Sequence, residues 1–223
     1  MEILVIGFQR SGTTLLRRMI QIHPQVRKIF HENFLLSKFR KDKKKLVQYI
    51  EIYGANINKD NWGEKVPFYG NIKNELHPLT YCQMWSELFP NSKIIHIIRH
   101  PIDVGLSIVN KYPNINNINE PLKKYVILMT SLIGDISELE NSITIKYEDL
   151  LLDTDRTINE VFKFCGLKED IEIQTRMSKI KRSKFQEINS SRAFSYKKQK
   201  NIEIKVNLEK VINKLNKIEG VEY

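Results

Sequence analysis

The feature that most constrains this 223-residue chain is a glycine-bracketed turn at residues 7–14, which reads Gly-Phe-Gln-Arg-Ser-Gly-Thr-Thr. The turn follows a short β-branched apolar run at residues 2–6, which is typical of a buried parallel strand. It leads into residues 13–22, where apolar side chains recur at helical spacing. The glycines enclose four residues, and a hydroxyl residue, Thr14, stands two positions after the second glycine. Strand, turn and helix in this order have the spacing of a phosphate-binding loop.

The loop differs from the Walker A pattern in its cation. Thr13 occupies the place of the usual lysine, while Arg10 supplies a positive charge inside the loop. Backbone N–H groups and the positive end of the following helix still favour a tetrahedral anion there. A ligand with a single 5′ phosphate linkage therefore fits better than a nucleoside triphosphate. The alternative is an ordinary Ser-Gly turn before a helix start, which hydroxyl residues favour in any case. The hydroxyl groups that would serve the anion are those of Ser11, Thr13 and Thr14.

Residues 93–98 and 142–146 are further β-branched runs that predict strands of the same parallel sheet. Helical periodicity lies between and after these runs. Strands that alternate with helices predict an α/β fold, with a central parallel β-sheet flanked by helices and ligands at the carboxyl edge of the strands. The predicted helices are 13–22, 35–53 with charged interruptions, 80–89, 102–111, 122–139, 158–165 and 208–218, with irregular structure at 115–121 and 183–199.

A second candidate anion site follows the predicted strand 93–98. The next residues read Arg-His-Pro-Ile-Asp, where Pro101 suits a first helical position and Asp103 a first turn. Arg99 then lies at the sheet edge, and Ser107 lies on the following helix, so that both reach one phosphate. An arginine–phosphate contact contributes roughly 1.5 to 3 kcal/mol. The alternative pairs Arg99 with Asp103 and leaves Ser107 on the helix surface.

Composition excludes several classes of protein. Hydrophobic residues make up 41% of the chain, which suffices for one core, and residues 1–223 are expected to form a single domain rather than a disordered chain. No window reaches the ~20 apolar residues of a membrane span, and Met1 leads directly into a strand without a signal sequence. These features predict a soluble, cytoplasmic protein. Cys82 and Cys165 are expected to be reduced, packed thiols.

The net charge of +10 is concentrated near the end of the chain. Residues 176–217 hold 13 basic and 3 acidic residues, so the remainder is balanced. A basic segment of this kind can hold an anionic ligand, dock on nucleic acid or a membrane surface, or form a solvated lysine-rich face.

The two motifs together resemble those of the sulfotransferases that use 3′-phosphoadenosine 5′-phosphosulfate (PAPS). Both occur in the expected order, and the run at residues 10–27 is most similar to the tyrosylprotein sulfotransferases and their bacterial relatives. The resemblance covers roughly residues 1 to 170 well and the remainder loosely. It implies the sulfotransferase variant of the P-loop fold. Further similar runs are Trp62-Gly63-Glu64-Lys65-x-Pro67, Leu88-Phe89-Pro90-Asn91-x-Lys93, Tyr147-Glu148-Asp149-Leu150-Leu151 and Phe162-x-x-Cys165-Gly166-Leu167.

The resemblance implies a role for each matching residue on the PAPS side. One end of PAPS, the 5′-phosphosulfate, would lie in the glycine-bracketed loop, and the 3′-phosphate would lie at the second motif. The basic segment 176–217 would close over the nucleotide. The implied residues are Arg10, Ser11, Gly12, Thr13 and Thr14 for the 5′-phosphosulfate, Arg99, Ser107 and Lys111 for the 3′-phosphate, Tyr147 for the nucleotide, and Ser195, Lys197 and Lys198 as tail candidates among which the alignment does not choose.

The resemblance also implies the groups that act on the acceptor. The tyrosylprotein enzymes place a glutamate base eight residues after a His-Pro pair, but here that position is His31, and Glu32 comes one later. We favour Glu32 as base and keep His31 as the second candidate, against a helix-capping Glu and a surface His. Lys65 would stabilise the charge that develops on the departing phosphate oxygen, with Arg10 beside it. The alternative for Lys65 is a pair with Glu64.

The expected reaction is in-line transfer of the sulfuryl group from PAPS to an acceptor hydroxyl, without a metal and without nucleic acid as partner. Tyrosine peptides, sugars, lipids and small phenols stay open as acceptors, and the oligomeric state is open too. One rival is a small-molecule kinase with a degenerate phosphate loop, which would need Lys at position 13 and an acidic metal ligand where Arg99 stands. The other is a polyanion-binding module that uses the basic segment.

Overall fold

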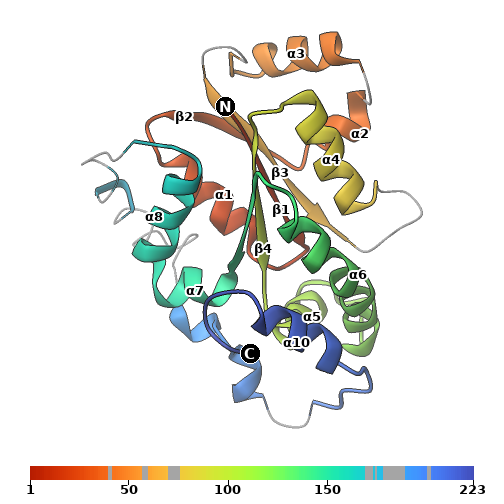
Figure 1. Cartoon of the computed structure of the whole chain (residues 1–223). Coiled ribbons are helices and arrows are strands. Elements are labelled where there is room, and N and C mark those ends of the chain that lie inside the picture. The colour runs from red at the N-terminus through yellow and green to blue at the C-terminus, as the bar shows by residue number, and fades with distance from the viewer. Residues whose placement is uncertain are drawn as a thin grey trace.

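The centre of the molecule is a parallel β-sheet with the strand order β2-β3-β1-β4-β5 (Figure 1). The computed structural model describes residues 1–39, 42–56, 60–69, 76–168, 173, 175–177, 189–199 and 202–223. This parallel sheet, with helices beside it, confirms the predicted α/β fold. The strands are β1 (Glu2–Phe8), β2 (Val26–His31), β3 (Asn61–Phe68), β4 (Lys93–Ile98) and β5 (Ser142–Lys146).

Three of these strands, β1, β4 and β5, lie where the apolar runs predict them. The sequence reasoning missed β2 and β3. In β2, Arg27 and Lys28 interrupt the apolar pattern, because this strand lies at the edge of the sheet and exposes part of its length. In β3, Glu64 and Lys65 are completely buried, and their charged side chains conceal an interior strand from any hydrophobicity pattern.

Helices cover both faces of the sheet (Figure 1). Alternate side chains of β1 point to opposite faces: Ile3 and Val5 join one apolar core, and Leu4 and Ile6 join the other. The first core includes α1 (Thr13–Gln21), α7 (Tyr147–Leu152) and α8 (Thr154–Phe164). The second includes α2 (Leu35–Phe39), α3 (Lys43–Ile52), α4 (Pro78–Leu88), α5 (Pro101–Lys111), α6 (Asn119–Ser137) and α10 (Glu209–Asn216).

Most predicted helices agree with the structure to within a turn. The stretch 35–53 is instead two helices, because Asp42 caps a new start through a 3.1 Å bond from the Lys45 N–H. Of 115–121, the last three residues already belong to α6. Within 183–199, two short 3-10 helices occur, η1 (Ser190–Arg192) and η2 (Ser195–Lys198), while residues 183–188 lie outside the described residues.

Two other sequence expectations concern cysteines and membrane helices. Cys82 and Cys165 are free, buried thiols, one in each core, as predicted. In the part of the chain that the structure describes, every helix is too short or too polar to cross a bilayer.

The glycine-bracketed turn is held by close contact with strand β4 and helix α7 beside it. A Cβ on Gly7 would lie 2.5 Å from the carbonyl oxygen of Ile97 in β4. Gly12, immediately before α1, has φ 99°, and a Cβ there would lie 2.3 Å from the ring of Tyr147 at the start of α7. Glycine is thus required both by backbone conformation and by space, and the turn is packed against β4 and α7.

We predict that Gly12→Ala destabilises the fold by about 1 to 3 kcal/mol, because the added methyl group meets the Tyr147 ring and the backbone conformation is strained. Gly134→Ala is the matched control, since nothing lies within 4 Å of its Cβ position in α6, and helix propensity should make it neutral or stabilising. Urea denaturation of the three proteins measures both effects. Equal stability of the two variants would contradict the packing described for the turn.

Candidate active site

The ends of four neighbouring strands bring the predicted residues to one region. The turn of residues 7–14 follows β1, Lys65 lies near the end of β3, Arg99 follows β4, and Tyr147 follows β5. Parallel strands place all these ends on the same edge of the sheet. The sequence motifs, which are far apart along the chain, therefore meet in space.

The two predicted anion motifs are joined by hydrogen bonds. Arg10 has φ 67°, in the left-handed region that residues other than glycine seldom adopt. Its Nε donates to the Ser107 hydroxyl at 3.0 Å, and its carbonyl oxygen accepts from Arg99 Nη1 at 3.1 Å. This geometry directs a side chain of the first motif toward the helix of the second. An anion bound at either motif would lie close to both.

Arg99 is buried and lies against Tyr147, with its guanidinium carbon 4.4 Å from the ring centroid. The alternative pair with Asp103 is wrong. The Asp103 carboxylate instead accepts from the Ser195 hydroxyl at 2.6 Å and from the Tyr196 N–H at 2.8 Å. Among the described residues Arg99 forms no direct ion pair, although the Glu148 carboxylate acts on it at longer range, and its Nε has no hydrogen bond. A buried guanidinium without a direct carboxylate partner favours an anionic ligand.

Part of the basic C-terminal segment packs beside this arginine. Through Asp103, residues 195–198 are fastened to the start of α5, and the Arg192 carbonyl accepts from Arg99 Nη2 at 3.3 Å. Lys197 lies over the Phe194 ring at 4.6 Å, and Lys198 Nζ donates to the Ser191 carbonyl at 3.3 Å. The described part of the segment therefore adjoins the Arg99 site. Residues 178–188, with 200 and 201, lie outside the description.

Lys65 is the centre of the group of residues that includes the candidate base Glu32. Its fully buried side chain forms an ion pair with Glu32, and its Nζ is 3.3 Å from the Thr14 hydroxyl of the glycine-bracketed loop. Glu32 also accepts from the Tyr69 hydroxyl at 3.0 Å. The alternatives of a Lys65–Glu64 pair and of a helix-capping Glu32 are both wrong. Lys65 instead joins the candidate base to the anion loop.

Burial and charge act against each other in this group. Desolvation raises the pKa of Glu32, but bonds from Lys65 and Tyr69 outweigh it and leave the pKa below its usual value. Desolvation lowers the pKa of Lys65, opposed by Glu32 and reinforced by the positive charges of Arg17 and Lys111. Lys111 therefore lies on the same side of the molecule as Lys65. The ion pair is the protonation state that these opposing effects favour.

His31 adjoins this group from the end of β2. Its Nε2 lies 3.9 Å from the Glu32 carboxylate, and its side chain is half exposed. Desolvation first, and then the charge of Lys65, lower the pKa of His31, so the ring is neutral at physiological pH. The structure thus places both candidate bases side by side, with Glu32 in direct contact with Lys65.

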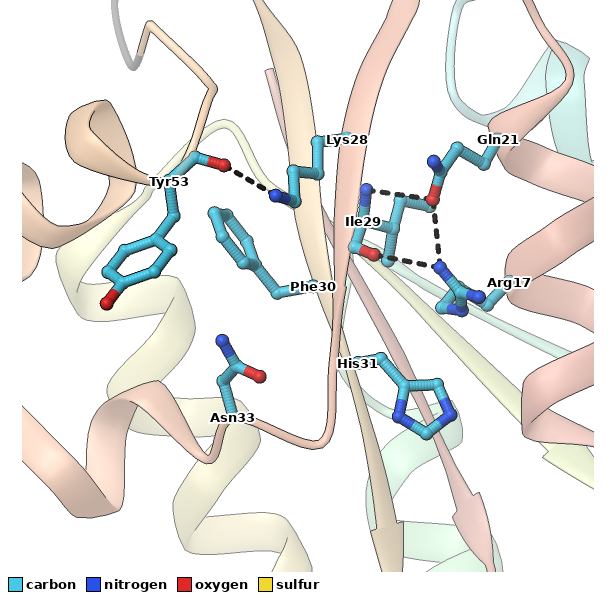
Figure 2. Close-up of a pocket in the computed structure, with 8 residues that line it drawn as sticks. All are labelled: Arg17, Gln21, Lys28, Ile29, Phe30, His31, Asn33 and Tyr53. Atoms are coloured by element: carbon cyan, nitrogen blue, oxygen red, sulfur yellow. Dashed lines mark hydrogen bonds between the residues drawn. The ribbon is translucent and has the colours of Figure 1, made fainter.

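A cavity of about 220 Å³ begins at His31 and follows the exposed edge of β2 (Figure 2). Arg17 Nη1 donates to the Ile29 carbonyl at 3.2 Å and to the Gln21 side chain at 3.0 Å, while the Ile29 N–H donates to the same Gln21 oxygen at 3.3 Å. Figure 2 shows Arg17 and His31 on one side of the strand, and Phe30 and Tyr53 on the other. The lining residues are Arg17, Gln21, Lys28, Ile29, Phe30, His31, Asn33 and Tyr53.

Two other histidines, His96 and His100, serve the fold. His96 in β4 is completely buried, which lowers its pKa to about 3. His100 caps α5 through a 3.3 Å bond from the Ile102 N–H and stacks on Tyr196 at 4.0 Å. Within the described ranges, His, Cys, Asp and Glu side chains form no group of three that could hold a metal ion.

Sequence reasoning missed three residues of this region. Tyr69 bonds Glu32 but stands just beyond the quoted run that ends at Pro67. Asp103 was expected as a first-turn residue or as a partner of Arg99, whereas it accepts a hydrogen bond from Ser195. Glu64 was regarded only as a partner for Lys65. The signal that was available for Glu64 was its position beside Lys65 in an extended segment, where adjacent side chains face opposite sides.

Comparisons with known proteins agree with this geometry. The model of the family described as "Sulfotransferase domain" matches residues 1–217. A 3-alpha-hydroxysteroid sulfotransferase of Cavia porcellus is 27% identical over 190 residues, covering 75% of this chain and 59% of that protein. The sulfotransferase domain from the curacin biosynthetic pathway has a TM-score of 0.66 at 19% identity and covers 96% of both chains. Mouse sulfotransferase SULT7A1 complexed with PAP has a TM-score of 0.51 at 20% identity, covering 90% of this chain and 66% of that one.

The chain therefore belongs to the sulfotransferase domain family, and the resemblance drawn from its two motifs is confirmed. The fold similarity extends to the full length of the curacin pathway domain. The chain spans only 59% of the length of the curated Cavia porcellus relative.

We predict that Lys65→Met raises the pKa of Glu32, because desolvation is then opposed only by the Tyr69 bond and the smaller effect of His31. The native carboxylate, with a pKa below 4.5, stabilises the fold above that pH, and the contribution is lost as the pH falls through the lowered value. NMR titration of the glutamate side chains, assigned with Glu32→Gln, measures the change. Lys124→Met, which breaks only the exposed pair with Glu120, is the control. An unchanged Glu32 pKa in Lys65→Met would refute the ion pair.

Proposed function

We propose that this chain transfers a sulfuryl group from PAPS to an acceptor hydroxyl. The observation that carries the proposal is the junction of the two anion motifs, in which Arg10 bonds both Ser107 and Arg99. Two positive sites at one sheet edge suit a nucleotide with phosphate groups at both its 5′ and 3′ positions. Related folds support the choice of ligand, since the mouse sulfotransferase SULT7A1 and retinol dehydratase were both solved with PAP. PAP is 3′-phosphoadenosine 5′-phosphate, the product that remains when PAPS loses its sulfuryl group.

In this proposal the loop holds the 5′-phosphosulfate and the second motif holds the 3′-phosphate. Two unpaired buried polar atoms among the described residues, Ser11 Oγ and Arg99 Nε, fit such a ligand. Tyr147, packed on Gly12 and Arg99, would form a wall of the nucleotide site. The remaining PAPS contacts are assigned to Thr13, Thr14 and Lys111, with Ser195, Lys197 and Lys198 as candidates from the C-terminal segment.

Glu32 would act as the general base and Lys65 as the electrophilic group. Glu32 takes the proton of the acceptor hydroxyl, whose oxygen forms a bond to sulfur as the bond from sulfur to the bridging phosphate oxygen breaks. Lys65, placed between Glu32 and Thr14, stabilises the charge that builds on that departing oxygen, with Arg10 beside it. As Lys65 turns toward this oxygen, Glu32 loses its counter-ion and becomes a stronger base. The chemistry needs no metal in this scheme, since the residues named supply the positive charge.

The acceptor would reach Glu32 from the cavity along β2, because His31 lines that cavity and also adjoins Glu32. The similarity to a 3-alpha-hydroxysteroid sulfotransferase and to retinol dehydratase solved with retinol makes hydroxyl compounds the first acceptors to screen. A phosphoryl-transfer reaction fits less well. It would use an acidic metal ligand at the end of β4, where Arg99 stands.

We predict that the protein binds PAP more tightly than ADP or ATP, and that Arg10→Ala weakens PAP binding at least tenfold by removing a guanidinium contact. Isothermal titration with the three nucleotides measures the affinities. Lys124→Ala, which removes one positive charge from the exposed face of α6, should bind PAP like the native chain. Tight ATP binding with no heat from PAP would end the assignment.

We predict that Glu32→Gln slows sulfuryl transfer by ~10² to 10⁴ fold while PAP affinity is retained, because the amide cannot accept the proton. His31→Ala should keep most of the rate. The native chain is first screened for transfer from labelled PAPS to a panel of phenols, sterols, sugars and tyrosine peptides. The transfer rates of the native chain and both variants are then compared on an acceptor that responds. A fully active Glu32→Gln beside an inactive His31→Ala would reassign the base to His31.

A further inference from the structure

Glu64 is a buried carboxylate that the reaction scheme does not use. It precedes Lys65 in β3, so the two side chains leave the strand on opposite faces of the sheet. Neither carboxylate oxygen forms an ion pair within the described ranges, although the side chain is completely buried. A buried carboxylate without a cation is costly, so its hydrogen-bond partners decide what it does.

Those partners lie in the turn that carries Glu32. The Leu35 N–H is 3.0 and 3.1 Å from the two oxygens of Glu64, and the Tyr81 hydroxyl of α4 donates to Glu64 at 2.7 Å. The Tyr81 oxygen in turn accepts from the Leu36 N–H at 3.2 Å. The carboxylate and the tyrosine together therefore bind two successive N–H groups at the start of α2, three residues after Glu32.

The same turn has an unusual backbone. Glu32 has φ 54° and Phe34 has φ 48°, so two residues with side chains occupy the left-handed region within three positions. Such a conformation is strained for a residue with a side chain and persists only where its surroundings hold it. On one side, the Glu32 N–H is bonded to the Lys65 carbonyl at 3.0 Å, and the Glu32 side chain is paired with Lys65. On the other side, Glu64 holds Leu35.

We propose that Glu64 is a positioning residue for the candidate base. Successive residues of β3 hold the turn from both faces of the sheet: Lys65 contacts the Glu32 carboxylate, and Glu64 contacts the backbone that follows it. The carboxylate of Glu64 compensates the strain at Glu32 and Phe34, and so aims Glu32 at Lys65 and the acceptor. The proposal rests on the proposed function for its effect on rate, but its effect on Glu32 can be measured without any reaction.

The surroundings of Glu64 also make its charge sensitive to pH. Burial raises its pKa to about 7, opposed by hydrogen bonds from Tyr81 and from the backbone of Leu35, Phe34 and Asn33. Tyr81 is the titratable side chain in contact with it, and desolvation raises the pKa of Tyr81 well above the usual value, so Tyr81 stays neutral. When Glu64 takes a proton, one acceptor oxygen becomes a hydroxyl. We therefore expect the hold on Leu35 to weaken below about pH 7.

The test compares Glu64→Gln with Tyr81→Phe. Glu64→Gln should lower kcat by about 10 to 100 fold, because a small misplacement of the base has such an effect, and should leave PAP affinity unchanged. In the native chain we expect kcat to fall as the pH drops below about 7, which gives the acid limb of the pH profile. This limb should be absent in Glu64→Gln. In Tyr81→Phe the limb should instead move to higher pH, since the lost hydroxyl bond lowers the pKa of Glu64 in the native chain.

A purely structural Glu64 would change thermal stability but neither the pH limb nor Glu32. NMR titration of Glu32 in Glu64→Gln is the readout that needs no PAPS, and we expect the Glu32 pKa to rise as its pair with Lys65 loosens. A native pH profile and an unchanged Glu32 pKa in Glu64→Gln would overturn the proposal. If Glu64→Gln does not fold, an unshifted limb in Tyr81→Phe would overturn it. If the native chain binds PAP without turnover while Glu64→Gln shows the expected rise in the Glu32 pKa, the result would count against the reaction, not against the positioning role.

Discussion

The site depends on the guanidinium of Arg99, which ties the turn after β1 to the helix after β4. Its Nη1 holds the Arg10 carbonyl, and its Nη2 holds the Arg192 carbonyl of the C-terminal segment, while its face rests on Tyr147. Among the described residues this buried cation has carbonyl partners but no direct ion pair, and the Glu148 carboxylate acts on it only at longer range. The residue that joins these segments therefore also supplies a positive electrostatic potential, which would attract an anion.

Much of this could be predicted from the sequence, and the failures have physical causes. The strands with short runs rich in β-branched residues and the loop of residues 7–14 were predictable because local pattern and fold agree there. β3 was not, since Glu64 and Lys65 are interior residues whose burial depends on partners distant in sequence, such as Tyr81 and Glu32. The contact between Arg10 and Ser107 was equally out of reach, because it depends on a backbone conformation at Arg10 that no spacing reveals.

Strand β3 shows how one strand can serve two purposes. Lys65 faces the anion loop and contacts Thr14 and Glu32, whereas Glu64 faces α2 and α4. Alternation along β3 thus separates charge stabilisation from the support of the turn. The low pKa of Glu32 and the high pKa of Glu64 follow from the same alternation, since one carboxylate has an ammonium partner and the other has neutral donors.

The edge strand β2 leaves backbone groups without a neighbouring strand, and such an edge is where other chains can add a strand and aggregate. Here the side chains of Arg17 and Gln21 occupy the N–H and carbonyl of Ile29, as a sixth strand would. Lys28 lines the same cavity from the other side of the strand, where its ammonium donates to the Tyr53 carbonyl (Figure 2). The helix that begins at the anion loop thereby also shields the open margin of the sheet from self-association.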